Sequence, residues 1–158
     1  MSKSIEMKEY IGTKLIRSRP CLASEASEIL GRKIETKNAD EQGNGYLVEY
    51  DNGEYLSWSP AVPHENAYKL NGELSFGMAN EFAKKGYKII RKGWNGNGMH
   101  VEWEFIDEKS KNTHPYLVII VPGCTEGTRR IPWQPAQVDL FQEDWSIVFE
   151  PESEVPAV

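Results

Sequence analysis

The segment Lys92–His100, KGWNGNGMH, places a tryptophan among residues that usually form tight turns. Trp94 is followed by Asn95 and by two glycines, and a second tryptophan, Trp133, precedes a short predicted helix. The face of an indole can stack on a purine ring, which contributes about 1–3 kcal/mol per base. These residues favour a site for a nucleotide-like ligand, although both tryptophans could instead fill the core of a small sheet.

Other groups that could contact a ligand lie near the two tryptophans in sequence. The amides of Asn95 and Gln137 can hydrogen bond to the edge of a base or to a ribose. Gln137 and Asp139 lie two residues apart on the predicted helix, so their side chains diverge by about 200°. We therefore favour Gln137 as the ligand contact and expect Asp139 to brace the Trp94 turn or to face a ribose hydroxyl. The guanidinium groups suited to a phosphate are those of Arg91, Arg129 and Arg130.

The catalytic inventory of the chain is small. His64, His100 and His114 show no spacing typical of a metal site, and no motif pairs one of them with a Ser or Cys nucleophile. Glu102 and Glu104 share one face of a predicted strand. A solvated sheet edge is a simpler interpretation of this pair than acid–base catalysis. We therefore expect no catalytic residue, no metal site, no cofactor and structural or surface roles for the histidines.

Composition and charge restrict the classes of partner. The 158 residues are 39% hydrophobic and 27% charged, as in soluble globular proteins. The net charge of −6 comes mostly from five acids in residues 143–158, so the remainder is nearly neutral. A nearly neutral body argues against DNA or RNA as a partner. No apolar run suggests a signal peptide or a membrane span, and Cys21 and Cys124 form no disulfide or metal pattern, which favours the cytoplasm.

Periodicity and turn signals predict an α+β fold of two small units, each an antiparallel sheet with one or two short helices. In residues 1–70 we expect strands at 10–18, 46–50 and 54–58, a helix at 22–30 ended by Gly31, and a second helix capped by Ser59 with Pro60 in its first turn. In residues 71–149 we expect a helix at 76–85 capped by Ser75, strands at 87–91, 99–105, 115–121 and 144–149, a loop at 122–128 and a helix from near Pro135. The acidic, proline-containing tail at 150–158 is predicted to be disordered.

The order of residues in 74–149 resembles that of the second type of Thoeris anti-defence protein, a family of small phage domains. The family pattern runs from Ser/Thr-Phe-Gly through Arg-x-Gly-Trp-Asn-Gly-x-x-Met to Pro-Trp-x-x-Ser-Gln-x-Asp-Leu-x-x-x-Asp-Trp. The matching residues are Ser75, Phe76, Gly77, Arg91, Gly93, Trp94, Asn95, Gly96, Met99, Pro132, Trp133, Gln137, Asp139, Leu140, Asp144 and Trp145. Ala136 replaces the usual serine, and Gln134 and Pro135 replace leucine and alanine, which bears on ligand selectivity.

The resemblance implies a function that composition does not show. Members of the family act as sponges: they bind glycocyclic ADP-ribose, a signal made from NAD by a Thoeris enzyme, and release it intact when denatured. Some relatives also take up the cyclic dinucleotides of CBASS-type defence, and members are tetramers with pockets between subunits. Carried over, the resemblance implies a homotetramer that acts in the cytoplasm of the infected bacterial host. The implied ligand contacts are Arg91, Trp94, Asn95, Met99, Trp133, Gln137 and Asp139.

Two alternatives to sequestration stay open at this point. One is a hydrolase of the same nucleotide, which the missing nucleophile and general base disfavour. The other is a structural phage module in which the tryptophans only fill the core. Residues 1–70, with GYLVEYDNGEYLSWSP at their centre, are similar to a small domain of phage proteins that has no firm activity and could be an accessory module or extend an oligomer interface.

Overall fold

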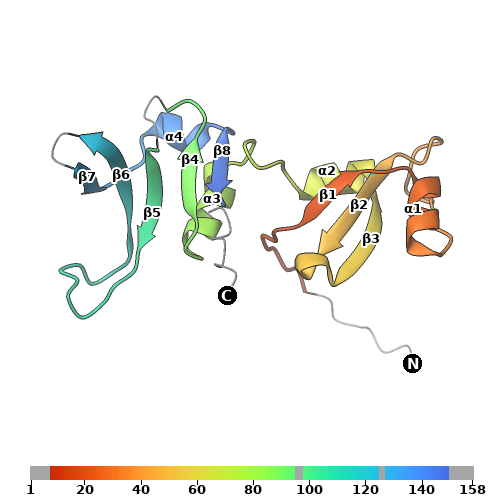
Figure 1. Cartoon of the computed structure of the whole chain (residues 1–158), viewed down its shortest axis with the longest axis horizontal. Coiled ribbons are helices and arrows are strands. Elements are labelled where there is room, and N and C mark those ends of the chain that lie inside the picture. Colours follow the sequence, from red (N-terminus) through yellow and green to blue (C-terminus); the bar gives the residue numbers. More distant parts are fainter. Residues whose placement is uncertain (1–7, 95–97, 125–126, 150–158) are drawn as a thin grey trace, which may run out of the picture. The chain divides into compact units, whose positions relative to one another are not determined.

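The computed structural model describes residues 8–94, 98–124 and 127–149 of the chain (Figure 1). The chain divides into two units, residues 1–68 and 69–158, and each unit contains its own β-sheet. Asn95 and the expected tail at 150–158 lie outside the described residues. Two antiparallel sheets with four short α-helices confirm the expected α+β class.

The first unit is a three-stranded antiparallel sheet with two helices. The sheet order is β1-β2-β3. Its elements are β1 (Arg17–Pro20), α1 (Ala23–Leu30), β2 (Gly45–Tyr50), the 3-10 turn η1 (Asp51–Gly53), β3 (Tyr55–Pro60) and α2 (Ala61–Ala67). The strands at 46–50 and 54–58 and the first helix are therefore confirmed to within two residues, and Gly31 ends α1 in the left-handed conformation with a φ of 63°.

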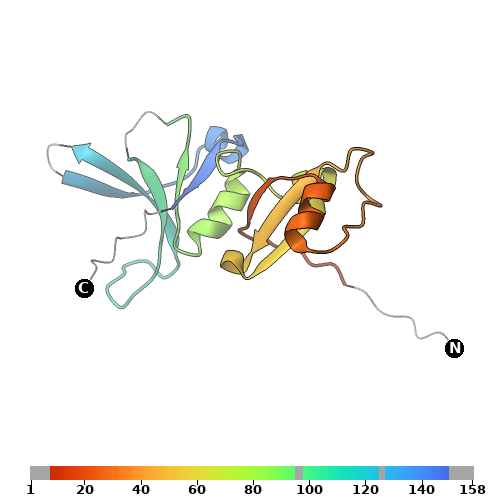
Figure 2. The same cartoon turned by 45° about the vertical axis from the view of Figure 1, so that its right-hand side comes forward.

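The β2–β3 hairpin explains how α1 and α2 come to cover opposite faces of the first sheet. Leu47 pairs with Trp58, and both pack with Ala23 and Ala26 of α1. Tyr46, the neighbour of Leu47, stacks on His64 of α2 with ring centroids 4.0 Å apart. Since successive side chains of a strand point to opposite faces, the two helices cover the two sides (Figure 2).

Two expectations for the first unit were wrong. Residues 10–16 form no strand, because β1 begins only at Arg17 where it can pair with Glu49. Ser59 does not cap α2: β3 continues through Pro60, which occupies the N-cap position, and the helix starts at Ala61. The backbone of Ser59 pairs with Tyr46 in the hairpin, so it is held in the extended conformation.

The second unit is a five-stranded antiparallel sheet of order β7-β6-β5-β4-β8. Its elements are α3 (Phe76–Ala83), β4 (Lys88–Arg91), β5 (His100–Glu104), β6 (Tyr116–Cys124), β7 (Gly127–Pro132), α4 (Gln137–Phe141) and β8 (Trp145–Val148). The N-terminus of α3 is capped as expected, because the Ser75 hydroxyl accepts a hydrogen bond from the Met78 amide. The core joins α3 to one face of β4, β5 and β8 through Ala79, Phe82, Ala83, Ile89, Val101, Trp145 and Ile147.

Two expectations for the second unit also need correction. Within the expected loop at 122–128, the described residues belong to strands, because β6 extends to Cys124 and β7 begins at Gly127. The helix expected from near Pro135 is confirmed to within two residues, since α4 begins at Gln137. Glu102 and Glu104 do not form a solvated sheet edge, because β5 is the central strand of the sheet. No helix among the described residues is long and apolar enough to cross a membrane.

Candidate functional site

Four aromatic rings meet at one end of the second sheet. Trp145, at the start of β8, is fully buried, whereas Trp94 and Trp133 are only partly buried. The Trp94 ring centroid lies 5.4 Å from that of Trp145 and 5.7 Å from that of Trp133, both in edge-on geometry. Phe76 of α3 completes the group at 5.3 Å from Trp145. Trp94 and Trp133 thus pack against the core without being fully buried in it.

Asp139 connects α4 to the tryptophans that surround it. Its Oδ1 accepts a hydrogen bond from the Trp94 indole nitrogen at 3.3 Å, and its Oδ2 accepts one from the Ala136 amide at 3.2 Å. Its backbone carbonyl accepts the indole N–H of Trp145 at 2.9 Å. Asp139 is only 9% exposed. The carboxylate therefore fixes the orientation of the Trp94 ring, which is the bracing position considered for it above.

Arg91, the last residue of β4, carries the compensating charge. Its Nη1 lies 2.7 Å from Asp139 Oδ1, and its Nε lies 2.9 Å from Asp144 Oδ1. The Arg91 side chain is 10% exposed. Hydrogen bonding to Arg91 holds the pKa of Asp144 below its ordinary value, and the bond to Asp144 raises the pKa of Arg91. Because two carboxylates already neutralise Arg91, the structure does not support the phosphate contact expected from the sequence.

Local sequence explains why these groups converge. Antiparallel pairing places Arg91 opposite Trp145, so the end of β4 lies beside the start of β8. The glycine at 93 leaves room for Asp144, since a Cβ there would lie 3.3 Å from its Oδ2. The short helix α4 lies at this end of the sheet (Figure 1) and directs Asp139 inward.

The remaining predicted contacts fall into three groups. Gln137, on the first turn of α4, is exposed, as the expectation for a ligand contact requires. Met99 is partly buried directly before β5. Asn95 lies outside the described residues, so its place at the site stays a prediction.

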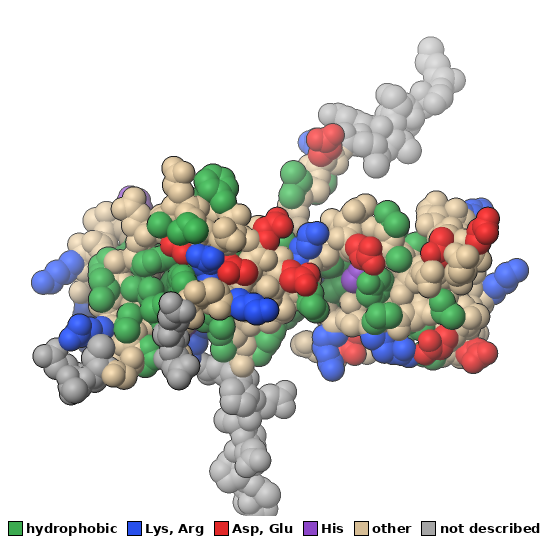
Figure 3. Space-filling model, turned by 90° about the horizontal axis from the view of Figure 1, so that it is seen from above, with side chains coloured by type: hydrophobic (Ala, Val, Ile, Leu, Met, Phe, Trp, Pro, Cys, Tyr) green, Lys and Arg blue, Asp and Glu red, His purple; other side chains and the backbone are tan. Residues whose placement is uncertain are grey.

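The exposed apolar side chains of the second unit include residues of α4 and of β7, the elements that flank Trp133 in the chain. Val138 and Phe141 of α4 are 58% and 77% exposed, and Ile131 of β7 is 47% exposed. Figure 3 shows hydrophobic side chains gathered on the second unit, at the left of the view, next to acidic and basic side chains. An apolar area of this kind is typical of an interaction surface.

A second polar cluster on the same sheet was missed by sequence reasoning. The Arg130 guanidinium on β7 contacts Glu102 at 2.9 Å and Glu104 at 2.5 Å. Both ring nitrogens of His100 have acceptors: the Gly98 carbonyl at 2.8 Å and the Glu102 carboxylate at 3.0 Å. Burial raises the pKa of Glu102, but the hydrogen bonds from His100 and Arg130 outweigh it and leave that pKa lowered. Arg130 is thus part of a structural ion-pair network, which argues against the expected phosphate role.

The three histidines lie in surface or structural positions, as the sequence predicts. His100 lies in the ion-pair network, and His114 is exposed. His64 is 7% exposed and shares a hydrogen bond of 3.0 Å with the hydroxyl of Ser18. Burial lowers the pKa of His64. Among the described residues no three His, Cys, Asp or Glu side chains are grouped so that they could hold a metal ion.

The part of the chain that contains this site is similar to known proteins. A family model described as the Thoeris anti-defense 2-like domain matches residues 74–148, which contain all four aromatic rings and the Arg91 ion pairs. The curated protein "Thoeris anti-defense 2" of Bacillus phage SP01 is 31% identical over 88 residues, which cover 50% of this chain and 99% of that protein. The similarity lies in about half of the chain and spans nearly the whole relative.

Proposed function

Because the chain belongs to the Thoeris anti-defense 2 family and has a phage anti-defence role, we propose a mechanism for that role. The protein binds a cyclic nucleotide immune signal and holds it without degrading it. The proposed ligand is glycocyclic ADP-ribose, the signal of Thoeris defence. The protein would act in the cytoplasm of the infected host, where removal of the signal leaves the bacterial effector inactive.

One observation supports this proposal above the others: Trp94 and Trp133 are only partly buried, and the indole N–H of Trp94 is bound from the core side by Asp139. The two rings lie at 79° to each other, so they offer two walls of different orientation. The Arg91–Asp139–Asp144 ion pairs hold the base of one wall. A ring system that stacks on either wall would gain about 1–3 kcal/mol.

The ligand contacts we propose follow from which side chains remain available. Gln137 is exposed beside the tryptophans and can bond a base edge or ribose hydroxyl. Asp139 and Arg91 act behind Trp94 rather than on the ligand, because their polar atoms bind one another at 2.7 Å. Met99 and Asn95 are proposed contacts from the turn itself.

We further propose that the functional form is a homotetramer whose copies complete each pocket. Val138 and Phe141 lie on α4, the helix that carries Asp139, and Ile131 lies two residues before Trp133; all three are exposed. A second copy would cover these side chains while it encloses the ligand. The second unit, residues 69–158, is too small to enclose a nucleotide within its own interior. Light scattering that gave the mass of a monomer at micromolar concentration would contradict this part of the proposal.

A capture-and-release experiment tests sequestration against hydrolysis. The protein is mixed with glycocyclic ADP-ribose, unbound ligand is removed by filtration, and the retained complex is heated and analysed by chromatography. Recovery of intact ligand supports sequestration, and recovery of a cleaved product would show an enzyme instead. Trp133→Ala, which removes one wall, is the control for non-specific retention.

CBASS-type cyclic dinucleotides form the second class of ligand to be tested in the same experiment. The replacement of the usual serine by Ala136, beside the exposed Gln137, changes the hydrogen bonding available at the first turn of α4. Capture of a cyclic dinucleotide with no capture of glycocyclic ADP-ribose would assign the chain to that defence pathway.

A further inference from the structure

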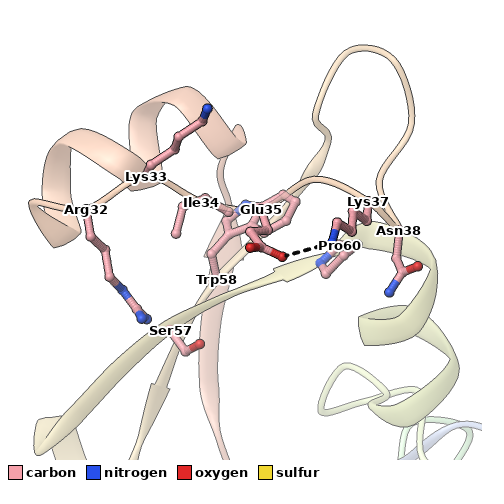
Figure 4. A pocket seen from close by; sticks show the side chains of 9 residues that line it. All are labelled: Arg32, Lys33, Ile34, Glu35, Lys37, Asn38, Ser57, Trp58 and Pro60. Atoms are coloured by element: carbon pink, nitrogen blue, oxygen red, sulfur yellow. Dashed lines mark ion pairs between the residues drawn. The ribbon is translucent and has the colours of Figure 1, made fainter.

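The first unit contains a cavity that the anti-defence site does not use. Its volume is about 540 Å³, within the range of sites for small organic ligands. Nine residues from the segment after α1 and from β3 line it: Arg32, Lys33, Ile34, Glu35, Lys37, Asn38, Ser57, Trp58 and Pro60 (Figure 4). From its lining we propose that this cavity binds a nucleoside phosphate or a close chemical analogue. The proposal is independent of the ligand of the second unit.

The wall of the cavity is fixed before any ligand arrives. Ile34 and Ala39 pack against the core that contains Trp58, and the Ile34 amide donates a hydrogen bond to Ser27 Oγ at 3.2 Å. Further along, Asp40 accepts hydrogen bonds from both the amide and the side chain of Asn44, at 2.9 and 2.8 Å. These anchors leave residues 35–38 as the rim, so binding would cost little ordering of the backbone.

Cationic and neutral donors dominate the polar lining. The Arg32 side chain extends along the cavity toward Ser57 (Figure 4), and among the described residues Arg32 makes no ion pair. Lys37 stands at the other side of Trp58, and its one ion pair within the described part of the chain is with Glu35, at 3.8 Å. That pair is 86% and 82% exposed, and exposed pairs of this kind are weak. An incoming phosphate could replace Glu35 as the partner of Lys37.

The floor of the cavity suits the uncharged part of such a ligand. Trp58 and Pro60 of β3 and Ile34 of the opposite wall are its apolar residues. The Trp58 indole N–H is bound to the Cys21 carbonyl at 2.9 Å, which fixes the ring. Guanidinium and ammonium groups recognise phosphate oxygens, and an apolar floor between them recognises a flat ring.

The lining supplies a matched pair of charge variants. Arg32→Gln removes the unpaired guanidinium, whereas Lys33→Gln removes the neighbouring charge, whose side chain points away from the cavity (Figure 4). Glu35→Gln removes the acid that competes with a phosphate for Lys37. We expect Arg32→Gln to weaken ATP binding about tenfold, Lys33→Gln to change it little, and Glu35→Gln to strengthen it severalfold.

The test is an NMR titration of the full chain with ATP, with adenosine and inorganic phosphate as separate probes. The indole N–H signal of Trp58 and the amides of residues 32–38 report on this cavity alone, so binding at the tryptophans of the second unit cannot be mistaken for it. Saturating shifts with ATP that Arg32→Gln weakens support the proposal. It is overturned if ATP shifts none of these signals up to millimolar concentration, if Lys33→Gln weakens binding as much as Arg32→Gln, or if adenosine or inorganic phosphate binds as tightly as ATP.

Discussion

Trp94 is held in place both by packing and by a polar bond. Its ring contacts the buried Trp145, and its N–H points to a carboxylate that is itself nearly inaccessible to water. The occurrence of a large aromatic residue among asparagines and glycines is therefore explained by a ring that Asp139 and Trp145 orient from the core side.

Alanine replacement of the tryptophans should separate ligand binding from stability. We expect Trp94→Ala and Trp133→Ala to weaken capture of glycocyclic ADP-ribose by about 1–3 kcal/mol each, up to roughly a hundredfold in affinity. Trp145→Ala, at a fully buried ring, should instead cost about 3–5 kcal/mol of stability. Calorimetry and thermal melting on the same variants check this. If Trp94→Ala melts as far below the parent as Trp145→Ala, the ring serves only the core.

Two residues on α4 should differ strongly in how much the same substitution destabilises the protein. Asp139→Ala leaves the guanidinium of Arg91 with one buried partner fewer and frees the Trp94 indole, so we expect a loss of about 3–5 kcal/mol in the free energy of unfolding. Gln137→Ala, on the exposed side, should leave that free energy within about 0.5 kcal/mol of the parent. Urea unfolding measures both, and equal effects would show that Asp139 is not part of the support.

At the scale of elements, the β6–β7 hairpin shows why a correct rule can mislead. Pro122 and Gly123 indicate a loop, since both residues usually end strands. The structure accommodates them by a shift in register between Val121 and Cys124, with Gly123 at a φ of 83°. A bulge of this kind lets two breaking residues sit inside paired strands. The sequence contains no local signal for it, because the partner strand decides whether the pairing continues.

Two glycines in the second unit allow a matched test of backbone conformation. Gly123 has a left-handed φ and no atom within 4 Å of a built Cβ, so Gly123→Ala should destabilise the fold through strain alone, by about 1–2 kcal/mol. Gly77, in the exposed part of α3, has a Cβ position whose nearest neighbour is 4.0 Å away. Gly77→Ala should therefore stabilise by about 0.5–1 kcal/mol. A melting temperature of Gly123→Ala at or above that of the parent would contradict the left-handed conformation of Gly123 in the bulge.

Most helices and strands were predictable from the sequence, but the support of the site was not. Ser75 as a cap, the hairpin around Asn52 and the strand at 145–148 follow from short-range rules that the structure confirms. The tryptophans of the site were recognised from the order of residues. The partners of Arg91, in contrast, come from positions 48 and 53 residues further along the chain, and they meet only when β8 pairs with β4. Sequence reasoning assigned Arg91 to phosphate because it had no means to see those carboxylates.

At the scale of the whole molecule, the two units should differ in their response to acid. Burial lowers the pKa of His64 in the first unit below the value of about 6.5 of an unfolded chain. The unfolded state therefore takes up the proton first, and the stability of this unit should fall as the pH drops below about 6.5. In the second unit, Arg91 lowers the pKa of Asp144, so its contribution persists above about pH 3.9 and is lost only as the pH falls further.

The indole N–H signals of Trp58 and Trp145 allow each unit to be followed separately in urea. Between pH 7 and pH 5 we expect the midpoint reported by Trp58 to fall and that reported by Trp145 to change much less. His64→Phe, which retains a ring against Tyr46, should remove most of the pH dependence. Equal midpoints for Trp58 at the two pH values would show that His64 does not control the stability of its unit.

The two sides of the short helix α4 should differ in how readily they accept substitutions during evolution. On its inner side, Asp139 is tied to Arg91, to Trp94 and to the N–H of Trp145, so any replacement there would require coordinated changes at distant positions. On its outer side, Gln137 and Val138 are exposed, and single replacements carry little cost to the fold of one chain. We therefore expect sequences of related domains to vary at positions 137 and 138 and to keep an acid at 139, and an alignment in which position 139 varied as freely as 137 would contradict this.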